Sequence, residues 1–378
     1  PGPACYGRGG PLTVTDLNLV LGRILPEQFS IPLSIDSAVI RLEELNSQIQ
    51  MATEHRYKIH DLAEALLTIA NHNMAQAIGN ISVARGYDPA DYTLVSFGGA
   101  AAQHACQVAQ LLGISKILNH PDAGILSAYG MGHAPTARQA DLGIYQTLSP
   151  NILKSLEQKT TETCHQLGRQ VEQEGYPLDQ IGVRILAELR PAGVDATLAI
   201  PMLDTPLKEL VWSISADELT DRFMSAHHRR YGFTVNKELE LVTLRIEVTG
   251  LNATATGVSE HQASHLLSAT STTECFAQGQ WQEAGRFERS QLRPGDQIAG
   301  PAIVTETIST TVIEPGWTAE VLSGDELLLT CDDCAKKSVE ISDDTDPALL
   351  EIFNNQFVAI AEQMGLTLQN TSSSVNVK

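Results

Sequence analysis

Apolar residues recur at steps of three and four between residues 61 and 81, and this spacing predicts a long amphipathic helix that faces a core. The apolar positions are Leu62, Leu66, Ile69, Met74, Ala77, Ile78 and Ile81. Arg85-Gly86, just before Asp88-Pro89, marks the end of this helix. The polar stretch 71–73, Asn-His-Asn, interrupts the pattern. Such a polar interruption is typical of an exposed helix face or of a packed histidine. Alternatively, these side chains reach a ligand.

A second apolar run, from Tyr92 to Phe97, stops at Gly98-Gly99 and gives way to helical spacing up to Leu112. This pattern predicts a strand, a tight turn and a helix, followed by a short strand over residues 116–119. Parallel strands joined by a covering helix indicate an α/β layer, in which ligands bind at the carboxyl ends of the strands. The glycine pair lies at such an end.

Beyond residue 150 the pattern changes. Residues 151–175 predict one polar helix, and residues 215–230 predict a second helix that carries Phe223 and His227. Strict alternation over residues 239–250 predicts a half-buried strand, and Pro-Gly and Gly-Asp pairs separate the later strands. After a polar, acidic linker at 333–345, an amphipathic helix begins beyond residue 346. The predicted fold class is therefore α/β followed by a β-rich, mainly antiparallel part and a C-terminal helix.

Composition excludes several kinds of partner. The chain has 378 residues and a formal net charge of −20, which repels a nucleic-acid backbone. Its longest apolar stretches are far shorter than the roughly 20 residues that span a bilayer, so no membrane partner is expected. No secretory signal opens the sequence, and six scattered cysteines are typical of reduced thiols, so we expect a cytoplasmic location. Cys331 and Cys334 have the spacing of half a zinc site but lack a nearby second pair, so no metal site is predicted.

The glycine turn is the best candidate binding site. Two residues without Cβ let a ligand approach the backbone, and the free N–H groups of the next helix favour an anion such as a nucleotide phosphate. We therefore assign Gly98, Gly99, Ala100 and Ala101 to nucleotide binding, with Gln103 and His104 as weaker contacts from the first helical turn. No Lys-Ser/Thr pair completes a P-loop, and turns of this kind also serve only to pack a helix on a sheet.

A second candidate group lies in the polar, glycine-rich opening block. Arg8, Asp16, Asn18 and Arg23 either order a ligand cleft or, in the case of Asp16, cap a helix predicted from Leu17 to Ile24. His227 near Tyr231 is either a packed structural histidine or a contact to substrate or to another domain. No catalytic base or nucleophile is predicted from sequence distance.

Several blocks in order resemble the hydantoinase/5-oxoprolinase family, and within it the ATP-dependent 5-oxoprolinases. The blocks are residues 1–10 (PGPACYGRGG), 13–23 (TVTDLNLVLGR), the turn at 98–101, 124–132 (GILSAYGMG), Phe223 with His227 and 231–233 (YGF), 300–304 (GPAIV) and 314–317 (EPGW). One departure is Ala101, where the family usually has glycine, so the path of the turn is open at that position. The chain lacks an initiator Met and begins inside a motif, so we expect it to be a fragment.

The resemblance implies part of an actin-like (ribonuclease H-like) ATPase lobe at 1–145, a β-rich C-terminal domain of the hydantoinase A type at 146–332, and the start of a hydantoinase B-type domain at 346–378. It implies ATP and magnesium as cofactors and a small lactam substrate, 5-oxo-L-proline, which is opened to L-glutamate in glutathione metabolism. The implied partners are the rest of the same polypeptide and further copies in a homo-oligomer. The chain alone is expected to be inactive, since the phosphate loops and metal ligands of the family lie outside it.

Two alternatives stay open. The first is the A-type segment of an ATP-dependent hydantoinase or a related carboxylase, although the resemblance of residues 346–378 to a fused second half favours a 5-oxoprolinase. The second is a non-catalytic interaction module that uses its acidic surface and its terminal helix.

Overall fold

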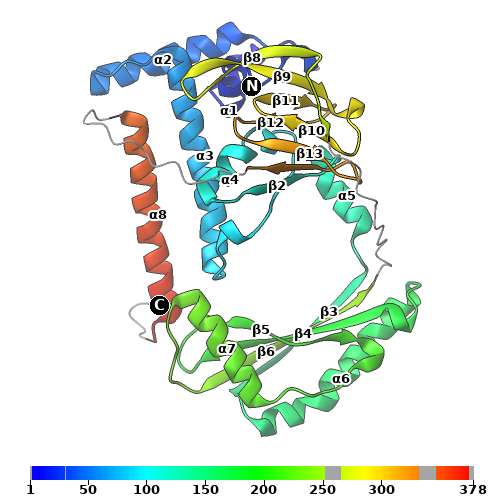
Figure 1. Ribbon diagram of the computed structural model, residues 1–378. Coiled ribbons are helices and arrows are strands. Elements are labelled where there is room, and N and C mark those ends of the chain that lie inside the picture. The colour runs from blue at the N-terminus through cyan, green and yellow to red at the C-terminus, as the bar shows by residue number, and fades with distance from the viewer. Residues whose placement is uncertain (1, 30, 252–264, 332–345, 374–378) are drawn as a thin grey trace. The chain divides into compact units, whose positions relative to one another are not determined.

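The strands of this computed structural model form three sheets, which belong to two separate units (Figure 1). The structure describes residues 2–29, 31–251, 265–331 and 346–373. Unit 1 comprises residues 1–82, 88–130 and 258–359, and unit 2 comprises residues 83–87, 131–257 and 360–378. Each unit is built around its own hydrophobic core.

Unit 1 contains two sheets and a helical layer. Its helices are η1 (Ala4–Tyr6), α1 (Val14–Val20), η2 (Pro26–Gln28), α2 (Ile35–Thr53), most of α3 (Ile59–Ala84), η3 (Pro89–Asp91), η4 (Ala101–Gln103), α4 (Ala105–Leu112), η5 (Ala123–Ile125), the start of α5 (Leu126–His133) and η8 (Arg289–Gln291). Its strands are β1 (Leu94–Ser96), β2 (Lys116–Asn119), β7 (His265–Leu266), β8 (Ser271–Ala277), β9 (Gln280–Glu288), β10 (Asp296–Ala299), β11 (Ala302–Thr305), β12 (Thr310–Ile313), β13 (Thr318–Val321) and β14 (Leu327–Thr330). Helix α8 (Pro347–Thr371) begins in this unit.

The larger sheet of unit 1 has the order β1-β2-β14-β13-β10-β7. β1 and β2 are parallel, as predicted, whereas β14 runs antiparallel to β2 with Leu118 opposite Leu328. Alternate residues of these strands, including Ile117 and Leu327, are fully buried in one core with Trp317. The second sheet has the order β12-β11-β9-β8.

The helical layer of unit 1 has a core of its own, formed by α1, α2 and α3. Leu17, Leu42 and Leu62 are almost fully buried there. A capping box starts α1, because the Thr13 hydroxyl and the Asp16 carboxylate each bond the backbone N–H at the other's position. Asp16 is therefore the third residue of a helix that begins at Val14, and it does not cap a helix from Leu17 to Ile24, as one interpretation of the sequence had it.

Unit 2 is a four-stranded antiparallel sheet covered by two helices (Figure 1). Its strands, in the order β3-β6-β4-β5, are β3 (Ala137–Thr147), β6 (Leu239–Gly250), β4 (Ile181–Pro191) and β5 (Leu198–Pro206). Its helices are α6 (Pro150–Gln173), η6 (Leu178–Gln180), η7 (Leu207–Glu209) and α7 (Ala216–Tyr231). Alternate residues of β4, such as Ile185 and Leu189, are buried with apolar residues of α6 and α7, which explains the period-two pattern.

The sequence predicted these elements well. Strands over 116–119 and 239–250 and the long helix α3 lie where expected, and α6 and α7 start within a residue of the predicted positions. The mixed α/β character and the C-terminal helix are confirmed. However, the predicted apolar face of α8 is exposed, with Phe357 at 70% and Leu350 at 55% of their full accessibility.

The division into units differs from the division expected along the sequence. Strands between residues 265 and 330 do not join unit 2, because β14 completes the sheet of β1 and β2. The linker predicted at 333–345 and Cys334 lie outside the described residues. Among the described helices, none is both long enough and apolar enough to cross a bilayer.

Candidate functional site

The predicted glycine turn lies between β1 and α4, at the carboxyl end of β1. Gly98 has φ of +99°, a left-handed conformation that favours glycine, and its N–H donates to the Ala123 carbonyl at 2.7 Å. Gly99 approaches another segment closely, since a Cβ there would lie 2.9 Å from the Ile308 carbonyl oxygen. Ala101 begins η4 and does not have a positive φ, so alanine in place of the family's glycine is compatible with this turn.

The turn presents free hydrogen-bond donors. Gly99, Ala100 and Ala101 are exposed. Within the described part of the chain, their backbone N–H groups bond no carbonyl or side chain. Unpaired N–H groups at the start of a helix form an anion site, because they and the helix dipole both favour negative charge. The turn therefore has the chemistry expected of a phosphate contact.

A pocket of about 600 Å³ opens next to this turn, within unit 1. It is lined by Gln28, Pro121, Asp122, Glu288, Arg289, Ser290, Thr305, Glu306, Thr307 and Ile308. Ile308 touches the turn, as described, and the loop after β2 supplies Pro121 and Asp122. The pocket thus lies at the carboxyl end of β2, where α/β sheets bind ligands, and it reaches the turn after β1 only through Ile308.

An ion pair between Arg289 and Glu306 lines this pocket, and its two facing atoms make no hydrogen bond to the described residues. Arg289 Nη1 lies 3.5 Å from Glu306 Oε1, with the two side chains 10% and 7% exposed. Neither atom has a hydrogen-bond partner among the described residues. Burial raises the pKa of Glu306 and lowers that of Arg289. A buried donor without a partner is costly, so a ligand that accepts from Arg289 would be stabilised here.

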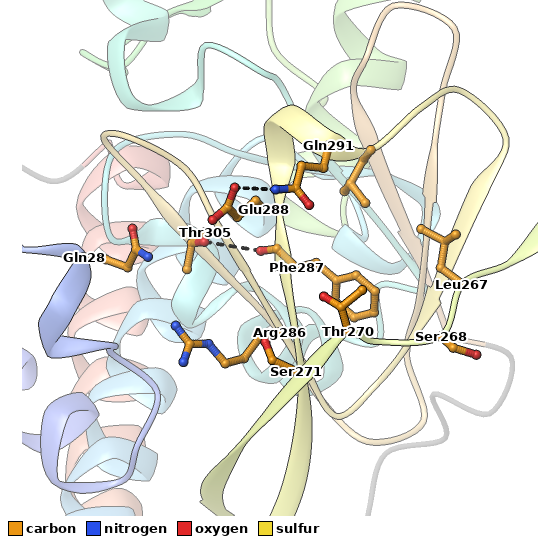
Figure 2. Close-up of a pocket in the computed structure, with 11 residues that line it drawn as sticks. Gln28, Leu267, Ser268, Thr270, Ser271, Arg286, Phe287, Glu288, Gln291 and Thr305 are labelled. Atoms are coloured by element: carbon orange, nitrogen blue, oxygen red, sulfur yellow. Dashed lines mark hydrogen bonds between the residues drawn. The ribbon is translucent and has the colours of Figure 1, made fainter.

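A smaller pocket of about 280 Å³ adjoins the first and shares Gln28, Glu288 and Thr305 with it (Figure 2). Figure 2 shows two hydrogen bonds within its lining: Gln291 Nε2 donates to Glu288 Oε2 at 2.7 Å, and Thr305 Oγ1 donates to the Phe287 carbonyl at 3.3 Å. The Arg286 guanidinium pairs with Glu27 at 2.6 Å. This pocket extends the first one and adds the hydroxyl groups of Ser268, Thr270 and Ser271 to its lining.

Behind the turn, three of the other predicted residues, Asn18, Gln103 and His104, meet in a buried polar network. Asn18 Nδ2 donates to Gln103 Oε1 at 3.0 Å and lies 3.4 Å from His104 Nε2. His104 Nδ1 lies 3.0 Å from Asn71 Oδ1. Because Nε2 faces a donor, it accepts, and the imidazole proton is on Nδ1 and points to Asn71. Gln103 and His104 therefore hold the turn from inside and do not face the pocket.

The network continues to a buried ion pair. Asn71 donates to Gln107, whose amide donates to Glu314 Oε1 at 2.9 Å. The same oxygen accepts from Arg23 Nη1 at 2.5 Å, and the Arg23 side chain is 0% exposed. Arg23 Nε and Nη2 find no partner in the described part of the chain. Hydrogen bonds between residues that are far apart in the sequence thus connect α1, α3 and α4 to the end of β12.

His104 is neutral in the folded protein at physiological pH. Burial lowers its pKa to about 4, and the charge of Arg23 acts in the same direction. A proton added to Nε2 would also face the Asn18 amide donor. The unfolded chain, with an ordinary histidine pKa near 6.5, binds this proton more readily.

We therefore expect His104 to destabilise the fold on acidification. Below about pH 6.5 the unfolded state takes up the proton and the folded state does not, so up to about 3 kcal/mol is lost by pH 4. Denaturant unfolding at pH 7 and pH 4.5 should show a smaller pH dependence for His104→Gln than for the wild type. The exposed His55→Gln is the control, and an equal pH dependence in all three proteins would contradict the assignment.

Asp16 and Arg8 have different surroundings. Although burial opposes ionisation of Asp16, hydrogen bonds from Cys5 and Thr13 outweigh it and lower its pKa. Its oxygens accept from the N–H groups of Ala4 and Cys5 at 3.2 and 2.6 Å and from Thr13, so the carboxylate orders the opening block. Arg8 is exposed in the loop after η1 and contributes nothing to the buried network.

His227 also has a structural environment. It is buried, its Nδ1 lies 2.8 Å from the Phe233 carbonyl, and its ring packs edge-on against Phe233. The interpretation as a packed histidine agrees with this geometry.

Sequence reasoning assigned no site role to Gln107, Arg289, Glu306 and Glu314, and it offered a fifth residue, Asn71, only as part of the stretch 71–73. Two of them carried a signal. Asn71 stands in the polar interruption of the helix pattern, and Glu314 begins the block at 314–317. The remaining three are single polar residues without a motif, and only the fold brings them together.

Comparison with known proteins agrees with this picture. The model of the hydantoinase/oxoprolinase family matches residues 1–140, and that of the hydantoinase/oxoprolinase C-terminal domain matches residues 149–327. The chain belongs to the hydantoinase/oxoprolinase family. Its turn, the adjoining pocket and the buried network all lie within the matched residues.

Relatives with known names extend over the whole chain. It is 30% identical over 398 residues to 5-oxoprolinase 1 of Arabidopsis thaliana, covering 100% of this chain and 31% of that protein. It is also 30% identical over 402 residues to 5-oxoprolinase of Saccharomyces cerevisiae, with 100% and 30% covered. The chain therefore spans less than a third of the length of these relatives.

A solved structure shares the fold. The crystal structure of the ATP-dependent caprolactamase from Pseudomonas jessenii superposes with a TM-score of 0.72 and 23% identity, over 88% of this chain and 48% of that one. At this identity the similarity is evidence for the fold alone.

Proposed function

We propose that this chain is part of an ATP-dependent 5-oxoprolinase, which opens the lactam of 5-oxo-L-proline to L-glutamate while ATP is cleaved to ADP and phosphate. The exposed turn at 98–101, with three free backbone N–H groups at the end of a parallel strand, is the observation that carries the proposal. Similarity to 5-oxoprolinases along the whole of this chain supports the substrate class.

The residues of the turn are suited to hold the phosphates of ATP. The N–H groups of Gly99, Ala100 and Ala101 donate to phosphate oxygens, and Arg289 Nη1 supplies a charged donor from the pocket wall. The buried network keeps the turn in place, since Gln103 and His104 are bonded to Asn18 and Asn71. ATP supplies the phosphoryl group that activates the lactam carbonyl, after which water opens the ring.

Magnesium also fits the lining of the pocket. Mg²⁺ in phosphate sites is held by one or two carboxylates together with phosphate oxygens and water. Asp122 and Glu306 line the pocket together, and the charge of Asp122 contributes to the raised pKa of Glu306. These two carboxylates are therefore the candidates in this chain for contacting the metal of Mg-ATP.

A related ATP-dependent lactam hydrolase is the second candidate, because the chain is also 26% identical over 344 residues to caprolactamase subunit alpha of Pseudomonas jessenii. A third candidate is that the chain is the A-type segment of an ATP-dependent hydantoinase or carboxylase. ATP hydrolysis by the full-length protein, measured with 5-oxoproline, hydantoin, caprolactam, or acetone plus bicarbonate, separates them. Stimulation by 5-oxoproline alone is the expected result. Stimulation by another compound would assign that substrate, and stimulation by none would favour a non-catalytic module.

The remaining assignments follow from the same proposal. By family resemblance, residues 1–145 correspond to part of an actin-like ATPase lobe, 146–332 to the C-terminal A-type segment, whose strands beyond residue 265 fold with unit 1, and 346–378 to the start of a B-type domain within one longer polypeptide. That protein acts in the cytoplasm as a homo-oligomer, and this chain alone is inactive.

A further inference from the structure

A second anion site is suggested by a cluster of arginines in unit 2. A pocket of about 840 Å³ lies between α7, the start of β5 and residues 85–87, all within that unit. It is lined by Arg85, Tyr87, Leu198, Ala199, Ile200, Pro201, Asp221, Arg222, Ser225, Ala226, Arg229 and Arg230. Four of these residues are arginines, in a chain whose formal net charge is −20.

Three of the arginines have no carboxylate partner in the part of the chain that the structure describes. Arg222 is engaged, since its guanidinium pairs with Glu218 at 2.5 Å and donates to the Pro201 carbonyl at 2.6 Å. For Arg85, Arg229 and Arg230, no ion pair exists among the described residues. Most arginines elsewhere in the described chain are paired with an acid, for example Arg184 with Asp204 and Arg190 with Glu240.

The local structure brings like charges together. Arg222 and Arg229 are two turns apart on one face of α7, with Ser225 and Ala226 between them. Gly86, at φ of +76°, permits the chain after α3 to approach this face, because a Cβ there would lie 2.7 Å from the Arg229 carbonyl oxygen. Arg229 in turn lies over the Tyr87 ring at 6.0 Å. This approach places Arg85 beside the arginines of α7.

Stabilisation of the helix end explains only part of this arrangement. Arg229 and Arg230 are in the last turn of α7, where cations interact favourably with the helix dipole. Arg85 comes from a different segment, however, and Arg222 lies in the middle of the helix. Mutual repulsion of these guanidinium groups is relieved by an anion, and arginine recognises phosphate through paired N–H donors.

We propose that this pocket binds the polyphosphate group of a small molecule through Arg85, Arg229 and Arg230. The volume of this pocket is in the range of small-molecule sites. The pocket is therefore larger than a single phosphate group needs. Two sources share this chemistry: a nucleoside triphosphate and inorganic polyphosphate. The site lies in unit 2 and is distinct from the turn at 98–101, which belongs to unit 1.

The test uses the 378-residue chain carrying Gly99→Glu, so that the turn does not contribute to binding. Calorimetric titration with sodium triphosphate should give saturable binding, weakened about tenfold for each arginine removed in Arg85→Gln and Arg230→Gln. Arg169→Gln removes an exposed arginine from α6 of the same unit and should leave the affinity within about twofold. Circular dichroism and thermal midpoints verify that each variant is folded.

Titrations with ATP and with triphosphate distinguish the two possible ligands. ATP binding more tightly than triphosphate would identify a nucleotide, whereas equal affinity would identify the polyphosphate group itself. The proposal would be overturned if Arg169→Gln lost as much triphosphate affinity as the pocket variants, if Arg85→Gln and Arg230→Gln lost none, or if no triphosphate bound at all. Equally tight binding of a penta-glutamate peptide would also overturn it, because the pocket would then select charge without selecting phosphate.

Discussion

Replacing Arg23 with alanine is expected to destabilise unit 1 by about 3–5 kcal/mol. The Arg23 side chain is fully buried, and its Nη1 donates to Glu314 Oε1 at 2.5 Å. Removing the guanidinium leaves the Glu314 carboxylate in a buried site, where the Gln107 amide is the one remaining donor among the described residues. Urea unfolding followed by tryptophan fluorescence in a Trp212→Phe background reports on this unit, because Trp317 is buried in one of its cores whereas Trp212 packs against the core of unit 2.

Two further variants isolate the cause. Arg41 pairs with Glu44 at 2.7 Å, but its side chain is 39% exposed, so Arg41→Ala should cost less than about 1 kcal/mol. The double variant Arg23→Met with Glu314→Gln removes both charges and should recover part of the loss, since Arg23 Nε and Nη2 lack partners. An Arg23→Ala cost no greater than that of Arg41→Ala would contradict the role of this pair.

Replacing Gly99 with glutamate is expected to weaken Mg-ATP binding by the full-length protein about 100-fold or more. The side chain would start from the exposed turn, beside the three free N–H groups that are proposed to hold phosphate. Two like charges about 4 Å apart repel by about 4 kcal/mol at an effective dielectric constant of about 20. Calorimetric titration measures the affinity directly.

Gly99→Gln is the matched control, because it adds a side chain of the same size without the charge. Any Cβ at this position approaches the Ile308 carbonyl at 2.9 Å, so the glutamine variant should also lose some affinity, but less. If the two variants bind Mg-ATP as tightly as the wild type, the turn only packs α4 against the sheet.

Local structure was readable from the sequence because it depends on neighbouring residues. Leu241, Leu244, Ile246 and Val248 are buried in β6, which the alternating pattern over 239–250 had predicted. Division of the chain into units was not readable, since it depends on the pairing of β2 with β14, about 200 residues later. No local pattern records which strand completes a sheet.

The candidate site shows the same limit. Glycine and the apolar run before it predicted the turn at 98–101, and the structure places free donors there. The partner of Arg23 is Glu314, 291 residues away, and nothing near Arg23 in the sequence points to it. Sequence reasoning grouped Asn18, Gln103 and His104 with the ligand, whereas their side chains are buried behind the turn and bonded to one another or to Asn71.

Hydrogen exchange of the full-length protein with and without Mg-ATP tests the central claim most directly. The amides of residues 99–101 are exposed and free of partners in the described structure, so they should exchange fast without nucleotide and become protected when phosphate accepts from them. Protection of a peptide spanning residues 97–104 is the predicted result. Saturation with Mg-ATP that protects other segments and leaves this peptide unchanged would contradict the assignment of the nucleotide to this turn.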